Sequence, residues 1–422
     1  MLWRDDVHVL YSSGFAIDFL WPLPADAMTP VSSFAFSRVP EIHFGPGKLS
    51  SLPQHIARFG KNVLLLTGDA SFKRSAAWPR LVTALEHAGI TAIRVSLRGE
   101  PSPAFVDATV ERCRSERIDC VVGIGGGSVL DAGKAVAAML PQEGSVIPYL
   151  ECVDSLKHDG RKIPFIAVPT SSGTGSEATK NAVLSEIGSD GYKSSLRHDN
   201  FVPDMALIDP ELMLGCPPDV TAACGLDTLT QLLEAYVSTK ASPMTDALAL
   251  DGLAHVARGF MAAYENGSEY LAARADMAYA ALLSGIVLAN AGLGVVHGFA
   301  APLGGFFPIP HGVVCGTLIG AATRINIETM RQSSGRYSAA LEKYARAGAV
   351  LSGQPTALGV DAGCDALVRT LDGWIAITGV ARLSAYGVGH ADLARILDRS
   401  NNKNSPVTLD RLQMESILET RL

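Results

Sequence analysis

Four polar residues in the second half of the chain have the types and spacing of a metal site. Asp227 and Gln231 are four residues apart in a stretch with helical periodicity, which places both side chains on one helix face. His297 and His311 stand in strongly apolar surroundings, where a polar group needs a partner. A carboxylate and two imidazoles would suit a divalent transition metal that keeps a position open for substrate. The spacing alone leaves a structural interpretation open, in which the carboxylate caps or pairs and each histidine is a hydrogen-bonded core residue.

Two loops rich in glycine and hydroxyl groups could hold a phosphate-bearing cofactor. The first, Gly125-Gly126-Gly127-Ser128, follows the apolar run 120–124, and the second, 169–177, follows the apolar run 165–168. Glycines let the backbone approach a pyrophosphate, whose charge is met by free N–H groups and the positive end of a helix. A tight turn between strand and helix would explain the first loop alone. Because two such loops at the carboxyl ends of two strands form one cradle, together they favour a dinucleotide.

Alternating strands and helices are expected to position these loops. Short apolar runs predict strands at 63–67, 92–96, 120–124 and 165–168, and longer periodic runs predict helices at 81–88 and 105–115. This alternation predicts an α/β domain with a Rossmann-like, mostly parallel sheet. After residue 212 the strand signal stops, and helices are expected at 220–238, 243–264, 268–291 and 338–351. We therefore predict an N-terminal extension (1–32), a dinucleotide-binding α/β domain (33–211) and an all-α metal- and substrate-binding domain (212–422).

Composition restricts the class of protein. The 422 residues are 48% hydrophobic, which supplies a large core, and the formal charge of -7 without a long basic run argues against nucleic acid or an anionic membrane as the main partner. The apolar stretch 282–303 contains Asn290, His297 and several glycines, so we expect a buried helix and turn there and no membrane span. Seven cysteines without a Cys-x-x-Cys pair, and no signal-peptide pattern, predict a cytoplasmic protein.

The two loops resemble the GGGSxxDxxK and PTxxGTGSE signatures of the iron-containing alcohol dehydrogenases. The resemblance extends over about residues 34 to 420 and includes 40–47, which resembles that family's first strand and turn, and 100–103. It implies the dehydroquinate synthase-like fold of the family. It also implies NADP or NAD as cofactor, one divalent metal (iron or zinc), a small alcohol or aldehyde as substrate, and a homodimer.

The resemblance assigns roles to individual residues. Around the cofactor phosphates and nicotinamide it places Gly125, Gly126, Gly127, Ser128 and Asp131. On the adenosine side it places Thr170, Ser171 and Thr174, and at the nicotinamide ribose Lys193. It maps the four metal ligands of the family onto Asp227, Gln231, His297 and His311. Asp227, His297 and His311 would then be the catalytic residues. Hydride would pass between nicotinamide and the carbonyl carbon.

Two positions depart from the family pattern. Gln231 stands where the family has its first histidine ligand, and a neutral amide oxygen is a weaker ligand than imidazole. The related glycerol dehydrogenases resemble a version with three ligands, Asp, His and His, that holds zinc, so the other three residues could suffice. Ala301 stands where the family has a histidine that relays the proton of the alcohol, so the proton would travel through water or ribose hydroxyls.

Gly68 bears on the choice between NADP and NAD. The NAD users of the family have an aspartate at this position to bind the ribose 2′-hydroxyl. A glycine leaves room for a 2′-phosphate, and Lys73 and Arg74 follow closely in the sequence. Asp69 could instead supply the missing carboxylate, but we favour NADP.

Three other functions stay open at this stage. The tail 401–409 is similar to that of phosphonoacetaldehyde reductases, and maleylacetate reductases are also related, so an anionic substrate is one alternative. A lyase or cyclase of the dehydroquinate synthase type is the second, although the helices that carry the metal residues lack the basic cluster that such enzymes need. A non-catalytic cofactor-binding protein, in which Gln231 and Ala301 mark lost chemistry, is the third.

Overall fold

The computed structural model describes residues 33–354 and 359–422. The chain divides into a short N-terminal unit, Met1–Phe34, and a compact unit, Ala35–Leu422, which is the subject of everything below. The extension predicted at 1–32 lies outside the described residues.

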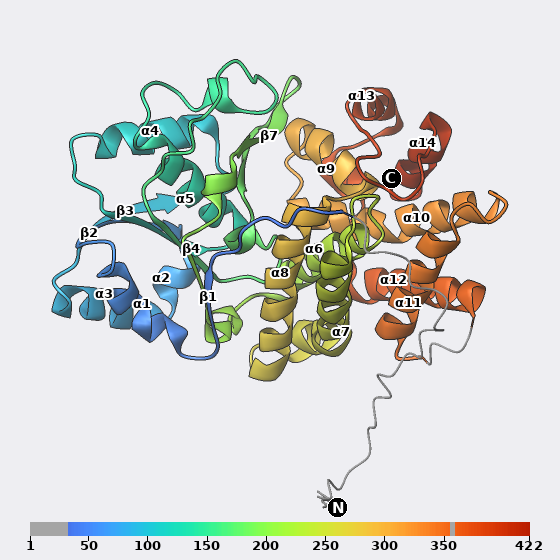
Figure 1. Cartoon of the computed structure of the whole chain (residues 1–422), viewed down its shortest axis with the longest axis horizontal. Helices are drawn as coiled ribbons and strands as arrows, with labels where there is room; N and C mark the ends of the chain where they lie inside the picture. Colours follow the sequence, from blue (N-terminus) through green and yellow to red (C-terminus); the bar gives the residue numbers. More distant parts are fainter. Residues whose placement is uncertain (1–32, 355–358) are drawn as a thin grey trace, which may run out of the picture. The chain divides into compact units, whose positions relative to one another are not determined.

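A parallel sheet of six strands forms the first half of the compact unit (Figure 1). The strand order is β1-β8-β5-β4-β2-β3, with every neighbouring pair parallel. The strands are β1 (Glu41–Phe44), β2 (Asn62–Gly68), β3 (Thr91–Leu97), β4 (Cys120–Gly125), β5 (Phe165–Pro169) and β8 (Met205–Ile208). The four strands expected from apolar runs and the parallel, Rossmann-like sheet are confirmed.

Helices cover both faces of this sheet because the central strands are apolar on both sides. In β2, Leu64 and Leu66 belong to one core cluster, whereas Val63 and Leu65 belong to another on the opposite face. The first face is covered by α4 (Pro103–Cys113) and α5 (Gly127–Met139), and the second by α1 (Leu52–Ile56) and α3 (Ala77–His87), as Figure 1 shows. The short α2 (Ser71–Arg74) follows the end of β2.

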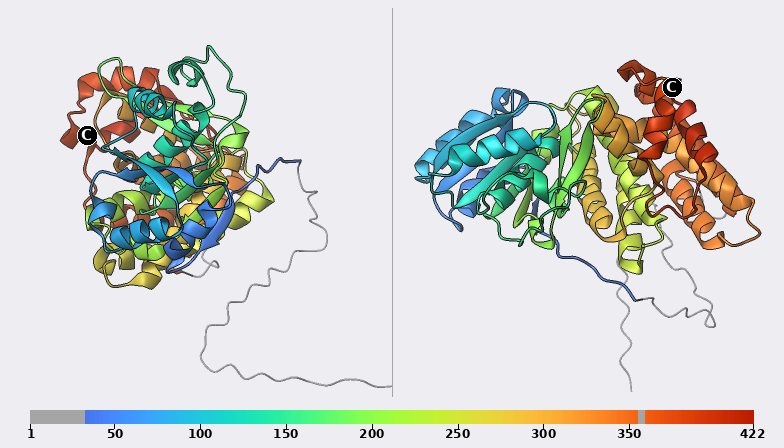
Figure 2. Two further views of the ribbon diagram at one scale, coloured as in Figure 1. Left: turned by 90° about the vertical axis from the view of Figure 1, so that its left-hand side faces the viewer. Right: turned by 90° about the horizontal axis from the view of Figure 1, so that it is seen from above.

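An antiparallel hairpin connects the sheet region to the helices. Its strands are β6 (Asn181–Glu186) and β7 (Tyr192–Arg197). β6 packs on α5, and β7 packs on α9 (Val295–Phe306), so the hairpin lies between the two halves of the compact unit (Figure 2, right). The sequence did not predict this hairpin, because its strands carry lysine and several serines and lack a clear apolar run. It matters for function because it presents Lys193.

The second half of the compact unit is helical. Its helices are α6 (Pro218–Tyr236), α7 (Pro243–Asn266), α8 (Leu271–Ala291), α9, α10 (His311–Arg331), α11 (Ser338–Ser352), α12 (Val360–Thr378), α13 (Leu393–Asp398) and α14 (Arg411–Glu419). The buried helix α6 packs against α7, α8 and α10 (Figure 1). The last strand of the sheet ends at Ile208 and α6 begins at Pro218, while the division into separate domains at 211/212 stays a prediction.

The apolar stretch 282–303 forms a helix end, a turn and a second helix, as expected. α8 ends at Ala291, Gly292 makes the turn with a φ of 69°, and α9 begins at Val295. A positive φ of this kind favours glycine. α8 is the one helix among residues 33–354 and 359–422 that is long and apolar enough to cross a membrane, but 67% of that apolar window is buried inside the protein. A core helix of a folded protein satisfies the same criteria.

A close approach of α10 to α6 brings the candidate metal residues together. A Cβ atom added to Gly316 would lie 2.8 Å from Cβ of Leu226, so the two helix backbones approach closely at this level. Any larger residue at position 316 would push α10 away from α6. The glycine thereby holds the first turns of α10, which carry His311, beside the turn of α6 that carries Asp227.

Candidate functional site

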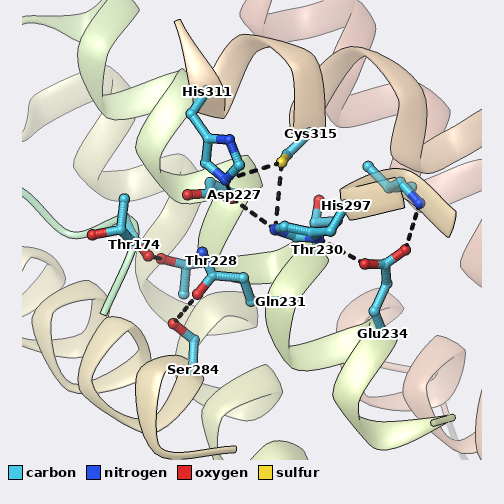
Figure 3. A network of polar contacts seen from close by, with 12 residues as sticks. Thr174, Asp227, Thr228, Thr230, Gln231, Glu234, Ser284, His297, His311 and Cys315 are labelled. Carbon is cyan, nitrogen blue, oxygen red and sulfur yellow. Dashed lines mark hydrogen bonds and ion pairs between the residues drawn. The ribbon is translucent and has the colours of Figure 1, made fainter. Parts of the chain in front are cut away.

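The predicted metal residues converge from three helices. Asp227 lies on α6, His297 on α9 and His311 on α10, and Figure 3 shows their side chains pointing toward one centre. Oδ1 of Asp227 lies 3.6 Å from Nε2 of His297 and 3.7 Å from Nε2 of His311. The carboxylate and His297 are almost fully buried, and His311 is partly exposed.

A fourth residue, Cys315, joins this cluster. Its Sγ lies 3.6 Å from Nε2 of His297 and 3.7 Å from Nε2 of His311, and ligand atoms of all four residues lie within 4.8 Å of one another. Our sequence prediction did not include Cys315. The signal was available, because a cysteine four residues after His311 on a helix falls on the same face.

Glu234 fixes the orientation of His297. Its Oε2 lies 2.7 Å from Nδ1 of His297, and its Oε1 accepts a hydrogen bond of 2.8 Å from the backbone N–H of Val296. When Nδ1–H donates to this carboxylate, Nε2 keeps its lone pair and faces the cluster. A carboxylate behind a histidine is the usual partner of a metal-binding imidazole. The sequence prediction missed Glu234 too, although it lies seven residues after Asp227, on the same side of α6.

Gln231 turns its amide oxygen away from the cluster centre. Oε1 accepts a hydrogen bond of 2.8 Å from the hydroxyl of Ser284 on α8, as Figure 3 shows. The residue is buried close to Asp227, one helical turn further along α6. As oriented, it does not offer its oxygen as a ligand, so its role as the fourth ligand stays a prediction that requires the amide to rotate.

Neighbouring groups shift the pKa of each residue in the cluster. Burial opposes charge on His297, but Cys315, Asp227 and Glu234 raise its pKa well above the usual value. Burial alone would raise the pKa of Asp227, but the nearby His311 and His297 lower it to about 2, so the carboxylate is anionic. Burial likewise opposes charge on His311 and lowers its pKa to about 4. Oδ1 of Asp227 has no hydrogen-bond partner among the described residues, although it is buried. A buried anionic oxygen without a partner is costly, and a metal ion between it and the imidazoles would remove that cost.

The two glycine-rich loops form one surface, as expected. β4 and β5 are neighbours in the sheet, and the N–H of Thr170 donates to the carbonyl of Gly125 over 2.9 Å. A Cβ added to Gly126 would lie 3.2 Å from Oγ of Ser171, and one added to Gly127 would lie 2.5 Å from Oγ1 of Thr174. Only glycine permits this proximity. No described side chain caps the N-terminus of α5, where the chain continues into Ser128, so its first N–H groups can receive an anion.

Asp131 and Lys134 form a buried polar network beneath this surface. Asp131 accepts hydrogen bonds from the hydroxyl of Ser176 (2.5 Å) and the backbone N–H of Val183 (3.1 Å). Nζ of Lys134 donates to acceptors on Ser176, within the second loop, and on Thr179 and Asn181, which follow it. The network ties α5 to the second loop. The predicted place of Asp131 at the cofactor stays a prediction.

Lys193, on β7, lies beside α9 and close enough to the metal cluster for its charge to act on His311. Its Nζ is 3.1 Å from a carboxylate oxygen of Glu100, and its side chain is 8% exposed. Its aliphatic stem packs beside Gly304 of α9, and its charge is among the causes that lower the pKa of His311. This position suits the nicotinamide end of a dinucleotide.

The end of β2 has space around Gly68. A Cβ added there would meet no described atom within 4 Å. The ammonium group of Lys73 donates to the hydroxyl of Ser96 at the end of β3, and Arg74 is exposed. Because Ser96 pairs in register with Thr67, the ammonium group of Lys73 lies close to the end of β2, and Arg74 follows on α2.

Comparison with known proteins decides the family. The sequence pattern described as "Iron-containing alcohol dehydrogenase" matches residues 40–210, and "Fe-containing alcohol dehydrogenase family, C-terminal" matches residues 221–422. The chain belongs to the iron-containing alcohol dehydrogenase family. The family uses NAD(P) and a divalent metal, and the chain is accordingly an oxidoreductase of the alcohol dehydrogenase type.

Relatives and solved structures of the iron-containing alcohol dehydrogenases agree with this assignment. The chain is 37% identical over 274 residues to long-chain-alcohol dehydrogenase 1 of Geobacillus thermodenitrificans, which covers 65% of this chain and 68% of that protein. It is 36% identical over 294 residues to 1,3-propanediol dehydrogenase of Citrobacter freundii, with 68% and 74% covered. A crystal structure of 1,3-propanediol oxidoreductase superposes with a TM-score of 0.82 at 30% identity, covering 93% of this chain and 100% of that chain. These relatives do not favour the lyase or the non-catalytic alternative.

Proposed function

We propose that the protein is an NADP(H)-dependent alcohol dehydrogenase that reduces a small, uncharged aldehyde, with one divalent metal held by Asp227, His297 and His311. The observation that carries this proposal is the unpartnered, buried Oδ1 of Asp227 beside Nε2 of the two histidines. Such an arrangement is the kind of three-ligand set that catalytic zinc sites use.

The residues of this chain would hold the metal and the cofactor in place for hydride transfer. The bound metal would supply Lewis acidity toward the substrate oxygen. Glu234 would hold His297 in the tautomer that presents a lone pair, and Lys193, paired with Glu100, would bind the nicotinamide end of the cofactor. With Ala301 at the position of a relay histidine, we expect water to carry the substrate proton.

The preference for NADP over NAD rests on the end of β2. The open space at Gly68 accommodates a 2′-phosphate, and Lys73 and Arg74 provide positive charge for it. The pyrophosphate would lie at the N-terminus of α5, against the surface formed by Gly126, Gly127 and the second loop.

The test compares wild type with Asp227→Asn, which keeps the side-chain shape and removes the charge. We expect NADPH oxidation with a panel of small aldehydes to fall by about 10³-fold, which corresponds to about 4 kcal/mol of transition-state stabilisation. NADPH affinity, measured by cofactor fluorescence, should stay unchanged, as should both quantities in the control Asp361→Asn on the exposed face of α12. Full turnover in Asp227→Asn would rule out the metal role of this carboxylate.

The same panel separates the remaining alternatives. Activity confined to phosphonate-, sulfonate- or carboxylate-bearing aldehydes would replace the uncharged substrate with an anionic one. NADPH binding without turnover on any aldehyde would point to a cofactor-binding protein that has lost its chemistry.

A further inference from the structure

The thiol of Cys315 occupies a position that the three proposed ligands leave uncovered. It is fully buried, and Sγ contacts Nε2 of both His297 and His311. A buried cysteine that only fills space has apolar neighbours, whereas this one faces two imidazoles and lies within 4.8 Å of a carboxylate oxygen.

The spacing of the Cys315 sulfur from the two histidine nitrogens is close to that of a tetrahedral site. With a metal–sulfur bond of about 2.3 Å and a metal–nitrogen bond of about 2.0 Å, the sulfur and nitrogen of a tetrahedral site lie about 3.5 Å apart. The two sulfur–nitrogen distances in this protein are 3.6 and 3.7 Å. The sulfur therefore already stands where a ligand would stand.

Local structure explains why Cys315 lies there. His311 begins α10, and Cys315 lies one turn later on the same helix face. The contact between Gly316 and Leu226 presses this turn of α10 onto α6, next to Asp227. Meanwhile the oxygen of Gln231, at the position of the family's first histidine ligand, accepts a hydrogen bond from Ser284.

We propose that the Cys315 thiolate is the fourth protein ligand of the metal, in place of Gln231, and that the resulting set of one aspartate, two histidines and one cysteine selects zinc over iron. This inference rests on the proposed metal site. On binding, the metal–sulfur bond forms while the thiol proton leaves to solvent. Two anionic ligands then balance the charge of the dication, and the substrate oxygen of the proposed function would take a fifth position. A thiolate is a soft ligand that favours zinc, whereas the family is named for iron.

The experiment uses cobalt(II) as a spectroscopic substitute for zinc. The protein is stripped with a chelator and reloaded with cobalt under anaerobic conditions, and its absorption spectrum is recorded together with its cobalt content. We expect one cobalt per chain and a thiolate-to-cobalt charge-transfer band in the near ultraviolet. In Cys315→Ser the band should disappear. In the control Cys364→Ser, a buried cysteine on α12 whose Sγ donates to the carbonyl of Leu341, the band should persist.

The outcomes distinguish this inference from the proposed function. Bound cobalt without the band in wild type would overturn the role of Cys315 and leave the metal site standing. No bound cobalt would overturn both. If Cys315→Ser does not fold, X-ray absorption of the zinc-loaded wild type decides: a sulfur neighbour at about 2.3 Å supports the proposal, and a shell of nitrogen and oxygen alone overturns it.

Metal selection is tested by competition. The stripped wild type, offered equal amounts of zinc and ferrous iron under anaerobic conditions, should retain zinc by elemental analysis. Retention of iron in excess of zinc would overturn the selectivity part of the proposal. In Cys315→Ser, zinc affinity should fall by more than the roughly 10- to 100-fold loss that follows removal of a partner behind a ligand.

Discussion

Oε2 of Glu234 lies 2.7 Å from Nδ1 of His297, on the side of the ring opposite the metal cluster. The same carboxylate also binds the N–H of Val296 at the start of α9. One side chain of α6 therefore sets both the position of α9 and the ring orientation of a proposed metal ligand.

Glu234→Gln tests this arrangement. A glutamine keeps the shape but can present an N–H to Nδ1, which would move the imidazole proton to Nε2 and block the lone pair that faces the cluster. We expect metal affinity, measured by titration against a competing chelator, to fall by roughly 10- to 100-fold. The control is Asp398→Asn, which removes an exposed carboxylate paired with Arg411. Unchanged metal affinity in Glu234→Gln would mean that the carboxylate only binds the backbone N–H of Val296 at the start of α9.

Gln231→His introduces the ligand found elsewhere in the family. The side chain lies one turn from Asp227 on α6, and Ser284 keeps a hydrogen bond to the carbonyl of Ala281 when Gln231 is replaced. We therefore expect a folded protein whose iron retention, measured by elemental analysis after anaerobic loading, increases relative to zinc. Ser284→Ala, which removes the hydroxyl that binds the amide of Gln231 and the carbonyl of Ala281 but adds no ligand, is the matched control. An unchanged ratio of iron to zinc would show that position 231 does not reach the metal.

Gly68→Asp should shift the cofactor preference from NADP toward NAD. The new carboxylate would repel a 2′-phosphate and bind a 2′-hydroxyl, and the space around Gly68 accepts it without displacing described atoms. We expect the ratio of kcat/KM for NADPH to that for NADH to fall by about 10- to 100-fold, or about 1.4 to 2.8 kcal/mol. Lys73→Ala should lower the same ratio, while Lys48→Ala, distant in the sequence, should not. A ratio that already favours NADH in wild type would contradict the proposed cofactor.

Elements whose structure follows from their own local sequence could be predicted, whereas elements that are stabilised by contacts with distant parts of the chain could not. Runs such as Val63–Leu66 predicted buried strands because apolar residues on consecutive positions require cover on both faces. The pairing of the two loops at the ends of β4 and β5 was also predictable, since parallel strands present their carboxyl ends at one edge. The hairpin β6–β7 was missed, because its polar strands are stabilised by packing on α5 and α9 and not by their own composition.

In the candidate site, too, residues with a local sequence signal were predicted and contacts between distant residues were not. Asp227, His297 and His311 were singled out as polar residues in apolar stretches, but it was the resemblance to the family's metal motif that favoured a metal site over a structural role. The structure brings the three together. Cys315 was not predicted because cysteine is a common core residue, so a cysteine in an apolar stretch does not by itself indicate a metal ligand. The orientation of Gln231 toward Ser284 is a contact between residues 53 positions apart, and no local pattern encodes it.

We expect Glu177, in the second glycine-rich loop, to make the stability of the protein depend on pH. Burial raises the pKa of this carboxyl from 4.5 to about 7, so the folded state binds its proton more tightly than the unfolded state does. Between about pH 4.5 and 7 the folded protein holds more protons, and the free energy of unfolding therefore decreases as the pH rises through this window. A full shift of this size corresponds to roughly 3 kcal/mol.

Glu177→Gln removes the ionisation and keeps the shape of the side chain. We expect its melting temperature to exceed that of wild type at pH 8 and the difference to disappear near pH 5, where wild type is largely protonated. The matched control is Glu186→Gln, in which the substituted carboxylate is exposed at the end of β6. A melting temperature of Glu177→Gln below that of wild type at pH 8 would show that the charged carboxylate stabilises the loop, for example through the nearby Lys134, whose charge favours the ionised form.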